Sequence, residues 1–241
     1  MIRKLLQNKN AHDNDSKRNY EIQRIETFSD GVFAFAVTLL IVSLEVPKNF
    51  EELMINMRGF FAFGISFLLL VFIWMEQHRF FRKYGLEDHW TIVLNVALLF
   101  LVLFYVYPLK FLFTLIFKDM IYSGAKAPLE ITDRQVPLLM QIYSLGYIAI
   151  YSLFTLMYVH AYKRREFLGL TAQEIFDCKT NIYKQFILVG IGLSSLICTF
   201  VLPLRNTDVS GYIYILIGPA LTIFFIIRKK AERKKFENGI N

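Results

Sequence analysis

The chain has 241 residues, of which 55% are hydrophobic and 20% charged, and its formal net charge is +7. The hydrophobic share exceeds the roughly 45–50% of soluble domains, and apolar and charged residues are segregated into blocks, which excludes a disordered chain, a collagen-like chain and a disulfide scaffold. The basic residues form no stripe with interleaved aromatic residues, so we expect no nucleic-acid partner.

Six apolar blocks follow a polar stretch at residues 1–23. Each block is too long for a buried strand, and none alternates with a period of two, which disfavours a membrane β-barrel. Helices are the other structure that satisfies backbone polar groups within lipid. The sequence therefore predicts an all-α membrane protein with six transmembrane helices. Their approximate bounds are Phe28–Val46, Gly59–Met75, Trp90–Phe117 with Pro108 inside it, Val136–Tyr162, Phe186–Leu204 and Tyr212–Ile227.

These blocks predict three regions: a cytosolic N-terminal arm at residues 1–23, a transmembrane domain at 24–230 and a basic cytosolic tail at 231–241. Lys and Arg are concentrated in the arm, in the tail and in the connections after the second and fourth helices. This positive-inside bias predicts a multi-pass protein of the cell (inner) membrane with both termini in the cytosol. The first 20 residues have no apolar core, so we expect no cleavable signal peptide. Cys178 and Cys198 lie in unlike surroundings, so we expect no disulfide between them.

The stretch from Arg24 to Gly31 places charged and hydroxyl side chains at the cytosolic end of the first helix. An unpaired charge at Asp30, next to the apolar block, would be costly, and Arg24 is a plausible partner for it. The alternative is an ordinary helix start. In that case Thr27 or Ser29 caps the helix, and Asp30 favours its positive end.

Two further polar residues, His78 and Asn95, lie in apolar surroundings at a depth similar to that of Asp30. They are candidates for one polar network with Arg24 and Ser29. The simpler interpretation is hydrogen bonding between packed helices, which is usual for polar side chains in membrane helices. A sharper interpretation is a gate or a proton-sensitive element, because histidine titrates near neutrality.

Phe35, Leu39 and Val42 follow an i, i+4, i+7 spacing and share one face of the first helix, and Thr38 borders that face. Such a stripe is ordinarily helix packing or lipid contact. In a symmetric oligomer it would instead form stacked hydrophobic rings around an axis, which gate by constriction or dewetting. A threonine ring would offer hydroxyl oxygens to a partly dehydrated cation, and Glu45 at the outer end would raise the local cation concentration.

Enzyme chemistry finds little support in the sequence. It contains no Gly-rich phosphate loop and no Cys/His pair at zinc spacing, so we expect no enzyme, no resident cofactor and no bound metal. A carbonyl filter of the TVGYG type is absent too, which excludes a conventional potassium-channel pore.

The stretch Arg24-x-x-x-Phe28-Ser29-Asp30 resembles the signature of the transmembrane protein 175 family of potassium channels. The similarity is sharp over roughly residues 20–110 and only topological beyond them. Further matching positions are Thr38-Leu39-Leu40 in the first helix, Trp74-x-x-x-His78 in the second, and Asn95 and Pro108 in the third.

The resemblance implies a potassium-selective leak channel of the single-repeat, bacterial type, assembled as a homotetramer, with K+ as the permeant ion and no cofactor. The first helix of each subunit would line the pore, with rings at Phe35, Leu39 and Val42 and with Thr38 facing or flanking them. A network that holds the pore helix would comprise Arg24, Ser29, Asp30, His78 and Asn95. One departure is Phe35, where the family usually has an aliphatic residue. Four phenyl rings on the axis bear on conductance and selectivity rather than on fold.

Two other functions stay open at this point. The first is a secondary or proton-coupled ion transporter that uses Asp30 and His78 as a relay. The second is a membrane scaffold that transports nothing and does not place its first helix on a symmetry axis.

Overall fold

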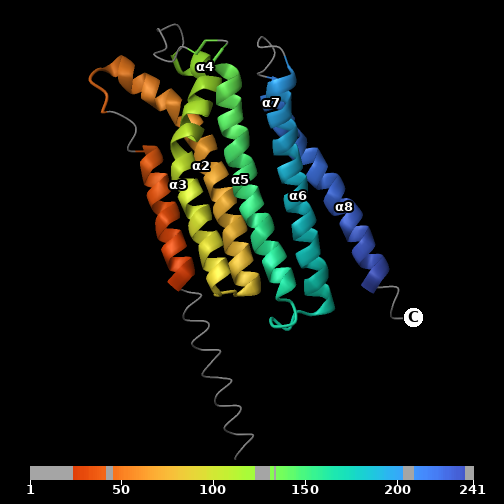
Figure 1. Ribbon diagram of the computed structural model, residues 1–241. Coiled ribbons are helices and arrows are strands. Elements are labelled where there is room, and N and C mark those ends of the chain that lie inside the picture. The colour runs from red at the N-terminus through yellow and green to blue at the C-terminus, as the bar shows by residue number, and fades with distance from the viewer. Residues whose placement is uncertain (1–23, 42–45, 123–130, 133, 203–208, 237–241) are drawn as a thin grey trace, which may run out of the picture. The chain divides into compact units, whose positions relative to one another are not determined.

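The computed structural model describes residues 24–41, 46–122, 131–132, 134–202 and 209–236 (Figure 1). All regular structure among these residues is helical, which confirms the all-α prediction. The chain divides into two compact units, residues 1–127 and residues 128–241, and each is described by itself.

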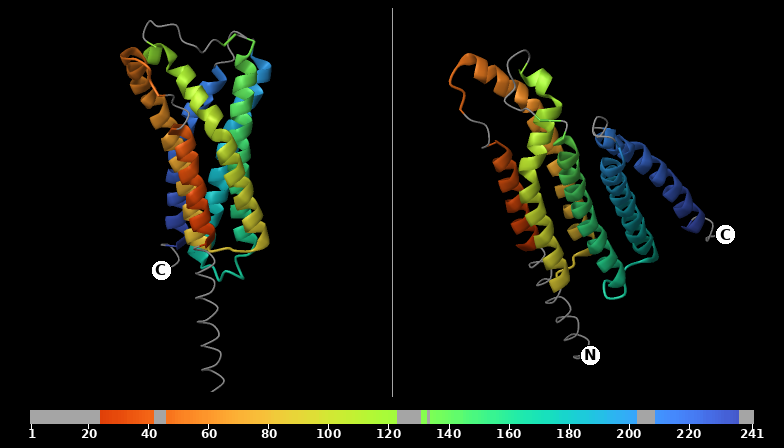
Figure 2. Two further views of the ribbon diagram at one scale, coloured as in Figure 1. Left: turned by 90° about the vertical axis from the view of Figure 1, so that its left-hand side faces the viewer. Right: turned by 45° about the horizontal axis from the view of Figure 1, so that its top comes forward.

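The first unit contains a helix over residues 24–41, called the first helix below, and then α2 (Phe50–Tyr84), α3 (His89–Ile116) and the short α4 (Lys118–Tyr122). The first helix runs beside α3 in all the views (Figures 1 and 2), and hydrogen bonds described below join the two. Because the first helix, α2 and α3 pack together, polar side chains from all three meet within this unit.

The ends of α2 are defined by local chemistry. The side chain of Asn49 accepts a hydrogen bond of 2.8 Å from the backbone N–H of Glu52, which caps the start of the helix. Glu51 and Glu52 lie in the first turn, where the helix dipole favours negative charge. At the other end Gly85 has a φ of 51°, a left-handed conformation that glycine adopts without strain, and it donates to the carbonyl of Phe81.

The second unit contains α5 (Val136–Lys163), α6 (Ala172–Val201), α7 (Val209–Tyr212), the 3-10 turn η2 (Ile213–Leu216) and α8 (Ile217–Phe236). Helix α6 begins with a capping box, in which Thr171 and Glu174 satisfy each other's backbone N–H groups. Where α5 and α6 pack, a Cβ atom on Gly192 would lie 2.8 Å from Tyr147 and Ile148. Glycine at this position therefore permits the close approach of the two helices.

Five helical segments are long and apolar enough to cross a membrane, by length and composition, within the part of the chain that the structure describes. Four are α2, α3, α5 and α6, and the fifth spans Val209–Lys234. The first helix is described only as far as residue 41, and residues 42–45, which include Val42 and Glu45, lie outside the described residues. The expected total of six spans therefore stays a prediction.

The predicted bounds of several helices are too short. The first helix is already helical at residue 24, and α8 continues to Phe236, beyond the predicted end at Ile227. Helix α2 begins at Phe50 and ends at Tyr84, beyond both ends of the predicted block, and α6 begins at Ala172 rather than at Phe186. The caps at Asn49 and Thr171 start these helices within polar sequence, whereas hydropathy marks only their apolar parts. Cys178 is buried and Cys198 partly exposed, and no disulfide joins them in the structure. The predicted arm at residues 1–23 lies outside the described residues.

Candidate functional site

The first helix has one face that is almost completely buried. Ser29, Phe33, Ala36 and Leu40 are each at most 5% exposed. Their spacing of four, three and four residues places them on one side of the helix. This side is the packing face of the helix within the first unit.

The opposite side carries the residues singled out for the pore. Phe35 is 57% exposed and Leu39 is 38% exposed, while Phe28, beside them on the helix, is exposed as well. Thr38 is exposed, and its hydroxyl donates a hydrogen bond of 2.9 Å to the carbonyl of Ala34 one turn earlier. Within a single subunit, this stripe is therefore much less covered than the packing face.

A buried chain of hydrogen bonds joins the first helix to α2 and α3. Asn95 of α3 donates through Nδ2 to Ser29 Oγ at 3.0 Å, and its Oδ1 accepts from Nε2 of Gln77 in α2 at 3.0 Å. The Ser29 hydroxyl donates in turn to the carbonyl of Ile25 at 2.8 Å. Because buried polar groups are costly unless they are paired, this chain fixes the rotation of the first helix against its two neighbours.

Ser29 therefore acts inside the helix and does not cap it. Residues 24–41 are all helical, so Thr27 and Ser29 both follow at least three helical residues. The interpretation of this stretch as a helix start with a cap at either residue is wrong.

Asp30 is bonded to an indole and not to the arginine that the sequence offers. Nε1 of Trp74 in α2 donates to Asp30 Oδ1 at 2.6 Å. Among the described residues no ion pair joins Asp30 to Arg24, which is exposed. Six residues at about 100° each place these two side chains about 120° apart around the helix, so they diverge. The expected Arg24–Asp30 pair is therefore absent within the subunit.

His78 joins this group through its ring. It stacks on Trp74 with ring centroids 5.6 Å apart and an interplanar angle of 18°. Asp30 and Trp74 also line an open cleft of about 360 Å³, whose other walls are apolar side chains of the first helix and α2. The predicted network residues thus fall into two groups, Ser29 with Asn95 and Asp30 with His78, and Trp74 links the members of the second.

Glu26 lies on the N-terminal side of the apolar block that begins at Phe28. Its Oε1 atom is buried, and none of the described residues donates a hydrogen bond to it. Burial raises the pKa of this carboxyl; the charge of His78 lowers it, the charge of Asp30 raises it and the charge of Arg82 lowers it, in decreasing order of effect. The surroundings of Glu26 thus raise the pKa of its carboxyl above that of the free group.

Sequence reasoning missed Lys110 and Gln77. The Lys110 ammonium in α3 donates to the carbonyl of Leu40 at 3.1 Å, near the far end of the first helix from Ser29. A lysine within an apolar block was the available signal, because an intramembrane charge is expensive and normally has a partner. Gln77 lies within Glu76-Gln77-His78, where it looked like part of the polar helix end. Helix α3 thus holds the first helix at two levels.

The described residues contain no group of three or more His, Cys, Asp or Glu side chains that could hold a metal ion. Val42, the third expected ring residue, lies outside the described part of the chain. The arrangement of the site is therefore that of a helix pinned on one side by polar contacts, with an apolar and hydroxyl-bearing stripe on the other.

Comparisons with known proteins identify the family of the chain. The sequence model of the endosomal/lysosomal potassium channel TMEM175 family matches residues 24–105, which span the first helix, α2 and most of α3. A potassium channel of Marivirga tractuosa is 42% identical over 237 residues, which cover 93% of this chain and 95% of that protein. A potassium channel of Chamaesiphon minutus is 36% identical over 96 residues, 36% of this chain and 47% of the relative.

Two solved structures of potassium channels also match the chain. The crystal structure of a T38A variant of the potassium channel MtTMEM175, in complex with a nanobody–MBP fusion, matches with a TM-score of 0.75 and 42% identity over 86% of this chain and 93% of that one. A lysosomal potassium-selective channel TMEM175 homologue from Chamaesiphon minutus matches in fold, with a TM-score of 0.56 and 24% identity over 87% of this chain and 98% of that one. The chain belongs to the TMEM175 family of potassium channels.

Proposed function

We propose that the chain is one subunit of a potassium-selective, leak-type cation channel in which four copies surround a pore lined by the first helix. The observation that carries this proposal is the division of that helix into two opposite faces. One face is buried and bonded to α2 and α3, and the other exposes Phe35, Thr38 and Leu39. The proposed location is the cell membrane, with both termini in the cytosol.

The exposed stripe supplies the barrier of the proposed pore. Phe35 and Leu39 are one turn apart, so four copies would form two successive apolar rings, and Val42 would form a third. An apolar constriction excludes ions by dewetting unless it widens. The phenyl ring at Phe35 is the bulkiest side chain of the stripe, so it is the residue that most restricts conduction.

Thr38 would supply oxygen ligands beside these rings. Its hydroxyl proton is directed at the carbonyl of Ala34, which leaves the lone pairs of Oγ1 for other partners. Four such oxygens could replace part of the hydration shell of a monovalent cation. In this proposal selectivity for K+ over Na+ arises from a side-chain hydroxyl layer and the width of the rings, without a carbonyl filter.

The two polar groups hold the pore helix in register. The hydrogen bonds of Ser29 with Asn95, and of Asp30 with Trp74, fix the rotation of the helix about its own axis. A rotation by half a turn would direct Thr38 and Phe35 toward the packing side and expose Ser29. The network therefore acts on conduction by orienting the stripe, and no resident cofactor is needed.

Ion flux from liposomes tests the proposal. Purified protein should carry K+ under a K+ gradient alone, and Phe35→Ala should carry more, because a ring of alanines is wider than a ring of phenyl groups. Phe100→Ala is the matched control, since Phe100 is similarly exposed but lies on α3. No K+ flux from either the wild type or Phe35→Ala would overturn the proposal.

The same assay addresses a proton-coupled transporter that uses Asp30 and His78. Trp74 stands between these two side chains, and an indole N–H donates a hydrogen bond but accepts none, so it does not relay protons. We therefore expect flux without a proton gradient. Flux that saturates and requires a proton gradient would favour the transporter.

A further inference from the structure

We propose that α8 carries a binding surface for anionic phospholipid headgroups, formed by Lys229, Lys230, Arg233 and Lys234. These four residues are called the basic arc below. The inference concerns the second unit alone and does not depend on which helix lines the pore.

The orientation of α8 against α6 is fixed by polar contacts. Arg228 donates through Nε and Nη2 to Thr180 Oγ1 at 3.0 and 2.7 Å, and its guanidinium lies 4.1 Å from the centre of the Phe176 ring. One turn later, Glu232 accepts a hydrogen bond from Nε2 of Gln173. Arg228 and Glu232 therefore define the side of α8 that faces α6.

The basic arc lies on the remaining sides of the helix. At about 100° per residue, its four members are about 100° to 240° away from Arg228. All four are exposed, and none forms an ion pair with a described residue. Glu232 is the acidic residue of Ile217–Lys234, and it lies on the docked side, so no carboxylate interrupts the arc.

The same side of α8 is apolar one turn before the arc. Ile223, Ile226 and Ile227 are all more than half exposed. Ile223 and Ile226 fall within the angular range of the arc, and Ile227 lies about 20° beyond its edge. In a bilayer this apolar stripe contacts hydrocarbon. The chain then changes from Ile227 to consecutive basic residues within one turn, so the arc lies at the headgroup level of the same lipid-facing side.

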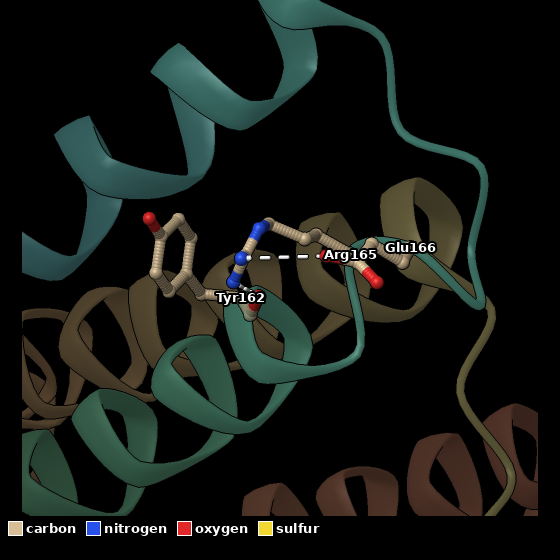
Figure 3. A network of polar contacts seen from close by, with 3 residues as sticks. All are labelled: Tyr162, Arg165 and Glu166. Atoms are coloured by element: carbon tan, nitrogen blue, oxygen red, sulfur yellow. Dashed lines mark hydrogen bonds and ion pairs between the residues drawn. The ribbon is translucent and has the colours of Figure 1, made fainter.

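A basic residue near this end of the second unit shows a different arrangement (Figure 3). Arg165 lies over the ring of Tyr162 at 4.8 Å, donates to the Tyr162 carbonyl at 3.2 Å, and is 3.6 Å from the carboxylate of Glu166. Arg165 is thus engaged by its own loop, as Arg228 is engaged by α6. The four side chains of the basic arc, by contrast, are exposed and follow directly on the apolar stripe of α8.

Anionic phospholipid fits these observations better than a soluble anionic partner. A soluble partner would need the basic residues alone, whereas a lipid needs an apolar surface that leads directly into them. Juxtamembrane clusters of four to eight basic residues attract anionic leaflets, and the attraction falls off within a Debye length. Each phosphate oxygen can accept hydrogen bonds from the ammonium and guanidinium groups of the arc.

The test measures the thermal unfolding midpoint of purified full-length protein in neutral detergent, with added phosphatidylglycerol or phosphatidylcholine. Phosphatidylglycerol should raise the midpoint of the wild type above its value in phosphatidylcholine, and about 0.5 M KCl should remove most of that difference. In the arc variant, Lys229→Gln, Lys230→Gln, Arg233→Gln and Lys234→Gln, the difference should be absent.

The matched control removes the same charge elsewhere, with Lys48→Gln, Arg58→Gln, Lys118→Gln and Arg134→Gln, all of which are exposed. It should keep the shift, as should a variant with Lys229, Lys230 and Lys234 replaced by Arg. An arc variant that keeps the full shift would overturn the proposal. If the arc variant does not fold, the wild type alone tests the proposal. Headgroup binding is contradicted if phosphatidylglycerol does not raise the wild-type midpoint, or if about 0.5 M KCl leaves that rise unchanged.

Discussion

Asn95 and Ser29 form a buried hydrogen bond of 3.0 Å between α3 and the first helix, although 66 residues separate them in the chain. Gln77 of α2 completes the group by donating to the other end of the Asn95 amide. One amide thus connects three helices, and it does so through both its donor and its acceptor. The rotation of the first helix, and with it the direction of the Phe35–Leu39 stripe, depends on this contact.

Asn95→Leu should destabilise the protein by about 1–3 kcal/mol, because it leaves Gln77 and Ser29 buried without their partner. Thermal unfolding of the purified variant measures the loss. Ser29→Ala should cost less, and the double variant should cost less than the sum of the two single changes. Additive losses would show that the two side chains are not coupled.

Trp74→Phe should lower the unfolding midpoint because it removes the indole donor to Asp30 and keeps an aromatic ring against His78. Asp30→Asn should cost less, since its amide oxygen can still accept that hydrogen bond. Arg24→Ala should have little effect on the folding of a subunit, because no ion pair with Asp30 exists there. If Arg24→Ala lowered the unfolding midpoint of the subunit as much as Trp74→Phe does, the assignment of Trp74 as the partner of Asp30 would be contradicted.

Lys110→Met should loosen the far end of the first helix. The methionine side chain has no donor for the Leu40 carbonyl, but it is similar in length to the aliphatic part of lysine. Hydrogen exchange of the amides in residues 36–41 should become faster, whereas exchange near Ser29 should not change. Lys110→Arg keeps a cationic donor, so its amides should stay as protected as in the wild type. Unchanged exchange in Lys110→Met would show that Lys110 does not hold this end of the first helix.

The raised pKa of Glu26 makes stability depend on pH in a defined direction. The folded protein binds the proton more tightly than the unfolded chain does, so the carboxyl favours folding most at pH values below about 4.5, the value of the free group. That contribution is lost as the pH rises from 4.5 through the raised value. Glu26→Gln should therefore flatten the fall in unfolding midpoint over this window, and a slope identical to that of the wild type would rule out the assignment.

The sequence predicted much of this site because polar residues in apolar blocks are conspicuous. Ser29 and Asn95 were found in this way and do bond to each other. The Arg24–Asp30 pair failed because proximity along the chain ignores the direction of side chains around a helix. The hydrogen bond between Trp74 and Asp30 does not follow from the residue pattern, because an indole is not an obvious partner for a carboxylate. The early start of α6 was missed because its first two turns are polar and depend on a capping box.

The central claim is that the exposed stripe of the first helix lines the ion path. Modification of cysteines by a charged thiol reagent tests it directly, in a background with Cys178→Ser and Cys198→Ser. K+ flux through liposomes containing Leu39→Cys should fall to a small fraction on modification, whereas Leu145→Cys, an exposed position on α5, should not respond. Unchanged flux through fully modified Leu39→Cys would contradict the claim.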